Sequence, residues 1–194
     1  MNSIPRFETT RFKLRAIFPA DAQGVFKLFS DPKVTHYYDF ETFENLKQAQ
    51  EMVAKFTHWF QIDHAVRWGI FEKESEELIG SCCLDTFHKG YHTCNIGYNV
   101  RSDHWGKGIA TEVATKIVEF GFENGIVGPL NRIQAVTVPE NEASERVLAK
   151  LGFEHEGLMR EFGYWNGRYR GDGPVRKLFL AGETKNWYHR CGNC

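Results

Sequence analysis

A glycine-bearing turn between an apolar run and an amphipathic stretch is the feature that most constrains how this chain can fold. The turn, Asp103–Glu112, has the sequence Asp-His-Trp-Gly-Lys-Gly-Ile-Ala-Thr-Glu. Its surroundings predict a strand over Cys94–Val100 and a helix over Val113–Phe120. A helix N-terminus carries unpaired N–H groups and the positive end of the helix dipole, and Gly106 and Gly108 let a ligand approach the backbone closely. The turn is therefore predicted to bind a phosphate or pyrophosphate.

The spacing of the glycines excludes two common phosphate-binding loops. A P-loop requires Gly-x-x-x-x-Gly-Lys-Ser/Thr, but Gly106-Lys107 is followed by Gly108, and Arg101 occupies the position of the first glycine. A dinucleotide-binding turn requires Gly-x-Gly-x-x-Gly, and position 111 is threonine. On local chemistry alone, a turn that merely joins two elements is an equally good interpretation, because short glycine motifs often occur by chance.

The wider context favours a ligand site. From Trp105 to Ala110 the chain resembles the Gln/Arg-x-x-Gly-x-Gly/Ala signature of the GNAT superfamily of N-acetyltransferases, with Gly108 and Ala110 at the two small positions and Trp105 in place of Gln or Arg. The form Trp-Gly-Lys-Gly-x-Ala-Thr-Glu is similar to the branch that contains the RimJ and RimL ribosomal-protein N-terminal acetyltransferases. Further stretches that resemble that branch are Glu8–Arg15, Ser30–Val34, Asn141–Ser144 and Lys150–Phe153.

The resemblance covers about residues 8 to 180 and implies the α/β GNAT fold, which is a mixed, mostly antiparallel twisted sheet with helices. Local patterns are compatible with that fold and predict about seven strands and about four helices. One acetyltransferase domain is expected over residues 1–180, with a C-terminal tail over 181–194. The predicted strands are 7–17, 67–72, 78–86, 93–100, 132–138, 153–165 and 169–180, and the predicted helices are 22–29, 45–60, 113–120 and 141–151.

Local signals also predict three finer features. Asp21 is expected to cap the first helix, since aspartate is a favoured N-cap residue. Glu112 and Lys116 lie four residues apart on the polar face of the helix after the glycine turn and are expected to form an ion pair. Asn166-Gly167 predicts a tight hairpin turn between the last two strands.

Composition restricts the class of protein. The 194 residues carry a net charge of −1 and are 42% hydrophobic, which is ordinary for a globular domain and indicates no general attraction to nucleic acid or membranes. No apolar run is long enough to span a bilayer and the N-terminus has no signal-like core, so a cytoplasmic protein is expected. The odd number of cysteines, five, argues against a disulfide framework. Cys191 and Cys194 form a CxxC pair that lacks a second pair of metal ligands.

The resemblance implies that acetyl-CoA supplies the acyl group and that no metal takes part. The pyrophosphate is expected on the backbone of the glycine turn, with Lys107 adding a charge from the rim. The pantetheine arm is expected along the edge of the preceding strand, which in the family is splayed from its neighbour. The expected cofactor-binding residues are Tyr98, Val100, Gly106, Lys107, Gly108, Ile109, Ala110, Thr111, Asn141 and Ser144.

Acetyl transfer requires a held thioester, a deprotonated amine and a stabilised leaving thiolate. Asn141 and Ser144 have the sequence of a helix start. In RimL-like enzymes a serine at the position of Ser144 is proposed to stabilise the thiolate, whereas many other GNAT enzymes use a tyrosine later in this helix, where this chain has Leu148. Ser144 is therefore the expected catalytic residue at the leaving group, and a purely structural role is the alternative.

The general base is less well defined. RimL-like enzymes carry a glutamate at the position of Gly163, and another acidic position in the family corresponds to Asn95. Glu161 lies two residues before Gly163 and would face the same side of a regular strand, so it is the candidate base, directly or through water. A solvent-facing strand residue is the alternative interpretation. No group of histidines has recognisable metal-ligand spacing.

The leading hypothesis is an acetyl-CoA-dependent N-acetyltransferase that moves an acetyl group to a primary amine by direct attack on the thioester. The acceptor is expected to be a protein N-terminus or a small-molecule amine, in a monomer or a homodimer. Asp39, Glu41 and Glu44 could attract a cationic amine or form a solvated loop. The alternative is a sensor that binds acyl-CoA without turnover, which the missing tyrosine and displaced glutamate leave open. A nucleotide-phosphate enzyme would need magnesium carboxylates that the sequence does not place.

Overall fold

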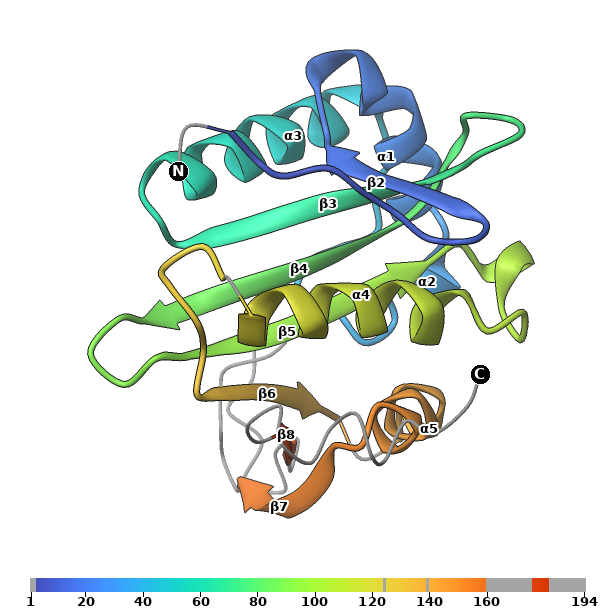
Figure 1. Ribbon diagram of the computed structural model, residues 1–194. Helices are drawn as coiled ribbons and strands as arrows, with labels where there is room; N and C mark the ends of the chain where they lie inside the picture. Colours follow the sequence, from blue (N-terminus) through green and yellow to red (C-terminus); the bar gives the residue numbers. More distant parts are fainter. Residues whose placement is uncertain (1–2, 124, 139, 160–175, 182–194) are drawn as a thin grey trace.

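The computed structural model describes residues 3–123, 125–138, 140–159 and 176–181. Within these residues a single sheet of eight strands has the order β1-β2-β3-β4-β5-β6-β8-β7 (Figure 1). All neighbours are antiparallel except β5 and β6, which are parallel. The strands are β1 (Phe7–Glu8), β2 (Phe12–Ala16), β3 (Ala65–Glu72), β4 (Leu78–His88), β5 (Thr93–Val100), β6 (Arg132–Thr137), β7 (Glu154–Met159) and β8 (Arg176–Ala181).

Five α-helices occur in the described part of the chain, and they cover both faces of the sheet (Figure 1). Strand residues alternate between the faces, so Leu78 packs in the cluster beneath α1 and α3 whereas Ile79 packs in the cluster beneath α4. Trp68 is fully buried in the cluster beneath α4, where its indole N–H donates to the Pro5 carbonyl at 2.8 Å. The helices are α1 (Ala22–Phe29), α2 (Pro32–Thr35), α3 (Leu46–Gln61), α4 (Ile109–Glu123) and α5 (Glu142–Lys150).

The observed class is the expected one, an α/β fold with a mixed, mostly antiparallel sheet. One element differs: the single strand expected over residues 7–17 is two strands, β1 and β2, which pair with each other. The Thr9 hydroxyl accepts the N–H of Phe12 at 3.1 Å and closes the turn between them. This split raises the number of strands from about seven to eight within the described residues. The Asn166-Gly167 turn and most of the tail, residues 182–194, lie outside the described residues.

The first helix begins at the expected residue, but the expected capping contact is wrong. Asp21 occupies the N-cap position of α1 without a side-chain bond to that helix. Its carboxylate instead accepts the N–H of Phe18 at 2.8 Å and pairs with Arg15 at 2.7 Å. The preceding 3-10 turn and the neighbouring arginine therefore satisfy this carboxylate. Asn45 does cap α3, with its side chain accepting the N–H of Gln48 at 3.2 Å.

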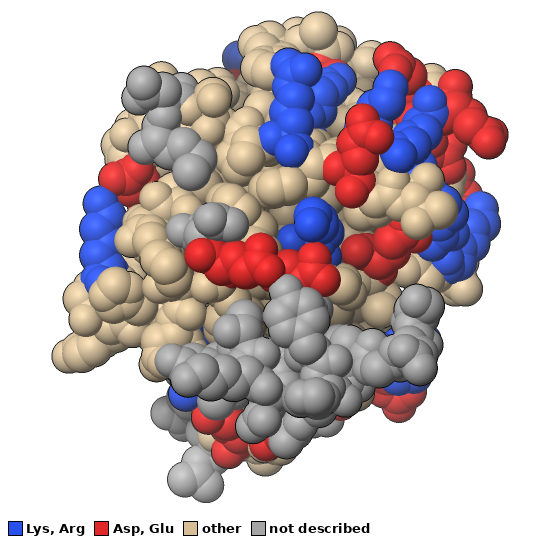
Figure 2. Space-filling view, in the orientation of Figure 1, with Lys and Arg blue, Asp and Glu red and all other residues tan. Residues whose placement is uncertain are grey.

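The surface carries both signs of charge. Figure 2 shows acidic side chains across the middle of the face that bears α4, with basic side chains above and beside them. This face therefore has no continuous basic stripe of the kind that follows a nucleic-acid backbone. Among the described residues, no helix is long and apolar enough to cross a membrane. The same part of the chain contains no cluster of three His, Cys, Asp or Glu side chains that could hold a metal ion.

The contact between β4 and β5 requires glycine at position 80. A Cβ added to Gly80 would lie 2.4 Å from the carbonyl oxygen of Asn99 and 3.1 Å from the Cα of Val100. We expect Gly80→Ala to lower the free energy of unfolding by about 1–3 kcal/mol, because overpacking forces the backbone to shift. Urea denaturation of the variant and the wild type measures this difference.

Gly90→Ala is the matched control for this substitution. Position 90 has an ordinary φ, and the nearest atoms to an added Cβ belong to the His88 ring, at 3.9 Å or more. The control should stay within about 0.5 kcal/mol of the wild type, as surface substitutions usually do. Equal stability of the two alanine variants would show that the strands can separate without cost.

Candidate active site

The two parallel strands diverge near the centre of the sheet. β5 pairs with β6 only over Thr93–Asn95, opposite Arg132–Gln134, although β5 continues to Val100 and stays paired with β4 to its end. Beyond Asn95 the outer edge of β5 has no partner strand among the described residues. Figure 1 shows β6 turning away from β5 at this point. Apart from the Val100 carbonyl, which accepts the Trp105 indole N–H, the outward-facing backbone groups of residues 96–100 are therefore free to pair with an extended ligand, as the resemblance implied.

A groove follows this open edge. It consists of two adjoining cavities of about 250 and 290 Å³. The smaller cavity reaches Trp105 and Ala110 at the glycine turn, and the larger one reaches Arg67 and Asp85 over the middle of the sheet. The groove therefore connects the glycine turn to a pocket over the middle of the sheet. The side chains that line both cavities are Tyr37, Tyr38, Tyr98, Asn141 and Ser144.

The two glycines of the turn have a backbone conformation that other residues rarely adopt. Gly106 and Gly108 have φ values of 76° and 73°, in the left-handed region where glycine is favoured. A Cβ at Gly106 would meet nothing within 4 Å, so the space above the turn is open. Lys107 is exposed at the rim, and Ile109 and Ala110 begin α4. Among the described residues, the N–H groups of residues 106–111 have no hydrogen-bond acceptor.

An arginine that the sequence analysis missed lies beside this turn. Arg11 comes from β1–β2, and its guanidinium lies 3.9 Å from where a Gly108 Cβ would be. It pairs with Glu112 at 2.7 Å, so the expected Glu112–Lys116 pair is wrong, and Lys116 pairs with Glu119 at 3.4 Å. The first strand is distant in sequence and ends over the turn, which is why spacing along the helix could not reveal this contact.

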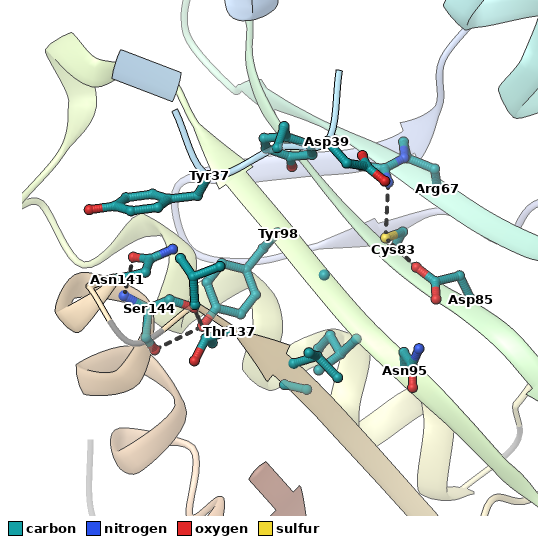
Figure 3. A pocket seen from close by; sticks show the side chains of 16 residues that line it. Tyr37, Asp39, Arg67, Cys83, Asp85, Asn95, Tyr98, Thr137, Asn141 and Ser144 are labelled. Atoms are coloured by element: carbon teal, nitrogen blue, oxygen red, sulfur yellow. Dashed lines mark hydrogen bonds between the residues drawn. The ribbon is translucent and has the colours of Figure 1, made fainter. Parts of the chain in front are cut away.

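Ser144 lies in the groove and is held by two other expected residues. Its N–H donates to the Asn141 side chain at 3.1 Å, which is the N-cap bond of α5. Its hydroxyl oxygen lies 2.9 Å from the phenol oxygen of Tyr98, and either hydroxyl can donate (Figure 3). Burial raises the pKa of the Tyr98 phenol well above its usual value, so the phenol keeps its proton at neutral pH.

Many GNAT enzymes have a tyrosine at the position of Leu148, and here a different tyrosine, Tyr98, places its hydroxyl beside Ser144. Leu148 is fully buried on the inner side of α5 and does not face the groove. The tyrosine hydroxyl near Ser144 therefore comes from β5 rather than from α5. Thr137 adds a third hydroxyl to this wall, and its oxygen is buried without a hydrogen-bond partner in the described part of the chain.

A carboxylate in the larger cavity was not found from the sequence. Asp85 lies on β4 directly opposite Asn95 of β5, where a bulge interrupts the pairing. One carboxylate oxygen accepts the Thr86 hydroxyl at 2.9 Å, and the other accepts the Cys83 thiol at 3.4 Å (Figure 3). Thr86 has a φ of 53°, a strained value for a β-branched residue. The strain is compatible with a functional position, because such outliers cluster at active sites.

The register of three strands explains why these side chains meet. Arg67, Cys83 and Gly97 lie opposite one another across β3, β4 and β5, and Asp85 pairs with Asn95 two positions along. All five therefore point to the face that carries α1 and α3. Gly97 contributes no side chain and leaves the space open. Burial raises the pKa of the Cys83 thiol to about 12, so it remains a neutral hydrogen-bond donor.

Some expected residues lie away from the groove or outside the described chain. Glu161 and Gly163, the expected position of the base, lie outside the described residues, as do Cys191 and Cys194. The Val100 carbonyl already accepts the Trp105 indole N–H at 2.7 Å. His104 lies away from the cavities, 3.3 Å from Glu72 and 2.8 Å from Asp103. Asp39 lines the larger cavity, but the rest of its acidic run does not.

Comparison with known proteins identifies the family. Residues 11–154 match the family model described as an acetyltransferase (GNAT) domain. The uncharacterized N-acetyltransferase YoaA of Bacillus subtilis is 40% identical over 163 residues, which are 84% of this chain and 90% of that protein. The [ribosomal protein uS5]-alanine N-acetyltransferase of Escherichia coli is 30% identical over 124 residues, 63% of this chain and 60% of that protein.

A solved structure shows the same fold. Spermidine N-acetyltransferase from Vibrio cholerae, in complex with CoA and spermine, superposes with a TM-score of 0.73 at 21% identity, over 90% of this chain and 96% of that one. The chain belongs to the GNAT family and is an N-acetyltransferase that uses acetyl-CoA. Its relatives include enzymes of the RimJ/RimL type.

The open backbone at Gly108 leads to a prediction about acetyl-CoA. We expect Gly108→Glu to abolish acetyl-CoA binding, because the new carboxylate would occupy the space above the turn and repel the phosphates. Isothermal titration calorimetry with acetyl-CoA measures the loss, and circular dichroism establishes that the variant is folded.

Gly128→Glu separates charge in the turn from backbone strain. Gly128 also has a positive φ, 98°, and a Cβ there would meet nothing within 4 Å. It lies between α4 and β6, at the opposite end of α4 from the glycine turn. The control variant should bind acetyl-CoA like the wild type. A folded Gly108→Glu protein with wild-type affinity would place the pyrophosphate elsewhere.

Proposed function

We propose that this protein transfers the acetyl group of acetyl-CoA to a primary amine, on a protein N-terminus or a small molecule, by direct attack of the amine on the thioester. The observation that carries the proposal is the groove along the unpaired edge of β5. It joins a turn with free N–H groups to a pocket with hydroxyls and a carboxylate. These are the parts that acyl transfer to an amine requires.

The cofactor lies along the groove with its pyrophosphate on the glycine turn. The N–H groups of residues 106–111 and the start of α4 provide donors and a favourable dipole for the phosphates. Arg11 and Lys107 add positive charge at the rim. The pantetheine arm pairs with the free backbone groups of β5 beyond Asn95 and follows the cavity that Tyr98 and Ser144 line. The thioester then lies beside Ser144.

The Ser144 and Tyr98 hydroxyls stabilise the leaving thiolate. The amine nitrogen forms a bond to the acetyl carbon, the carbon–sulfur bond breaks, and the sulfur takes the electron pair. Ser144 donates its proton toward that sulfur, and the Tyr98 phenol, which lies 3.1 Å from the Ser144 carbonyl and 2.9 Å from the Ser144 hydroxyl, turns its proton to the hydroxyl oxygen. Tyr98 is suited to this role because burial raises the pKa of its phenol and keeps it protonated.

Asp85 accepts a proton from the acceptor's ammonium, directly or through water, and so produces the neutral amine that attacks. It is a carboxylate in the larger cavity, and both of its oxygens are held in place by the Thr86 hydroxyl and the Cys83 thiol. Lysine-like amines have a reference pKa of about 10.4, so a base is needed at neutral pH. Glu161 is the second candidate for this role.

Relatives suggest two classes of acceptor. The Escherichia coli relative is named for an alanine of ribosomal protein uS5, and the Vibrio cholerae structure is of a spermidine N-acetyltransferase. Calorimetry with acetyl-CoA, followed by a thiol-release assay on a panel of peptides and small amines, tests the proposed reaction. We expect micromolar to millimolar binding and amine-dependent release of CoA thiol. Binding without release on any amine would instead favour an acyl-CoA sensor.

The role of Ser144 leads to a kinetic prediction. We expect Ser144→Ala to lower kcat by about 10²-fold, since a donor at a developing negative charge contributes on that order, while the affinity for acetyl-CoA stays nearly unchanged. Steady-state kinetics with acetyl-CoA as the varied substrate separates kcat from KM. Ser75→Ala, at an exposed serine in the β3–β4 turn, should match the wild type. Equal turnover in all three proteins would remove Ser144 from the mechanism.

The role of Asp85 leads to a pH prediction. We expect Asp85→Asn to lower kcat/KM at pH 7 by about 10²-fold, as loss of a general base does. The kcat/KM of the variant should then recover as the pH rises toward the pKa of the amine itself. A pH profile with an amine acceptor measures both effects. The rise follows because an amine that is already neutral needs no base.

Asp63→Asn is the control for the loss of a carboxylate. Asp63 is exposed and pairs with Lys89, away from the groove. Its variant should keep the wild-type profile. If Asp85→Asn also keeps that profile and Glu161→Gln acquires the steeper one, the base is Glu161.

A further inference from the structure

Arg67 forms part of the wall of the larger cavity, and the groups that accept its hydrogen bonds are neutral. One guanidinium nitrogen donates to the Ser81 hydroxyl at 2.8 Å, and another donates to the Cys83 sulfur at 3.1 Å. The central carbon of the guanidinium, Cζ, lies over the ring of Phe56 on α3, 4.8 Å from the ring centre. The phenol of Tyr38 is a further polar neighbour. The structure therefore holds this cation rigidly with partners that carry no charge.

The positive charge has no direct counter-ion among the described residues. Asp39 and Asp85 line the same cavity, and neither contacts the Arg67 guanidinium directly, although, against the effect of burial, the charge of Asp85 helps to raise the pKa of Arg67. A guanidinium has five N–H groups and stays charged in proteins, so donors remain for a further acceptor. An inward-facing charge without a paired anion is costly. A bound anion would remove that cost, and guanidinium groups bind planar carboxylates with two parallel hydrogen bonds.

The carboxylate of Asp85 lies on the other side of the Cys83 sulfur from Arg67. Cys83 accepts a hydrogen bond from Arg67 and donates one to Asp85 at 3.4 Å (Figure 3). The cavity thus has a positive pole and a negative pole that are separated by the width of one thiol. Figure 3 shows both poles on the side of the cavity opposite Tyr98 and Ser144. The acceptor must fit between these two walls.

We infer that the acceptor is a small zwitterion, an amine that carries a carboxylate on a nearby carbon, as an amino acid does. This inference rests on the proposed function and names the substrate class of that site. The carboxylate binds Arg67, and the amine lies between Asp85 and the Tyr98–Ser144 pair, where it meets the thioester. The cavity volume of about 290 Å³ suits a molecule of this size. A polyamine would instead bring only positive charge to Arg67.

Matched pairs of acceptors test the inference. A panel of L-amino acids, each compared with its carboxamide, is assayed for thiol release with acetyl-CoA. We expect kcat/KM for the best amino acid to exceed that of its amide by tenfold or more, because the amide lacks the anion that Arg67 binds. Equal or better use of the amides or of polyamines would overturn the inference and leave the acetyltransferase activity standing.

Substitution of Arg67 assigns the preference to that side chain. Arg67→Met should abolish the preference for the acid over the amide by raising KM for the amino acid, with KM for acetyl-CoA unchanged. Arg67→Lys should retain part of it, because lysine keeps the charge and loses the planar fork. Arg6→Met, at an exposed arginine before β1, should behave like the wild type. A uniform loss of activity on acids and amides in Arg67→Lys would show a merely structural role and contradict the inference.

A binding measurement makes the test independent of turnover. The N-acetylated amino acid keeps the carboxylate and lacks the charged amine, so its affinity for the CoA-bound protein reports on Arg67. We expect calorimetry to show binding to the wild type and at least tenfold weaker binding to Arg67→Lys. Such binding without thiol release on any amine would contradict the proposed function while supporting anion recognition. Absence of binding to the wild type would overturn the inference, and this outcome can be measured even if Arg67→Met does not fold.

Discussion

The separation of β5 from β6 beyond Asn95 is the constraint on which the rest of the site depends. Backbone N–H and C=O groups in a sheet are normally paired, and an unpaired edge inside a sheet must find other partners. Here the edge has no partner strand over residues 96–100, because β6 leaves it after three paired positions, and the Trp105 indole N–H occupies the carbonyl of Val100. A ligand with its own amide groups can take the place of the missing strand. The fold thus prepares the binding of an extended amide chain before any side chain acts.

The rest of the molecule keeps this opening in shape. β5 stays paired to β4 along its whole length, and the approach at Gly80 fixes how closely the two strands lie. α4 packs its buried face, including Ile117 and Val118, against the strands on one side of the opening. Leu148 anchors α5 on the other side. The groove therefore lies between two rigid walls, and the Tyr98–Ser144 bond joins them at the point where the thioester is expected.

The sequence was most informative where function depends on neighbours along the chain. Gly106, Gly108 and Asn141 have local roles, a positive φ and a helix cap, which short motifs record. Arg67 and Asp85 act through strand register, because their positions opposite Cys83 and Asn95 bring them to one cavity. Register cannot be read from a single strand, and the family pattern directed attention to other acidic positions. The tyrosine hydroxyl that contacts Ser144 likewise comes from a strand, at Tyr98, and a motif on the α5 helix could not show this contact.

Charge along the groove changes with the chemistry required at each point. The turn offers N–H groups, Arg11 and Lys107 to phosphates, and the middle offers only neutral hydroxyls. The far pocket offers one cation, Arg67, and two carboxylates, Asp39 and Asp85. The ammonium must release a proton at that end before its nitrogen can attack, while cleavage of the thioester creates an anion near Ser144. Because Tyr98 keeps its own proton, the proton of the amine cannot be taken up by the phenol. A separate acceptor is needed on the amine side, and among the described residues Asp85 is held in the pocket with both oxygens oriented for that role.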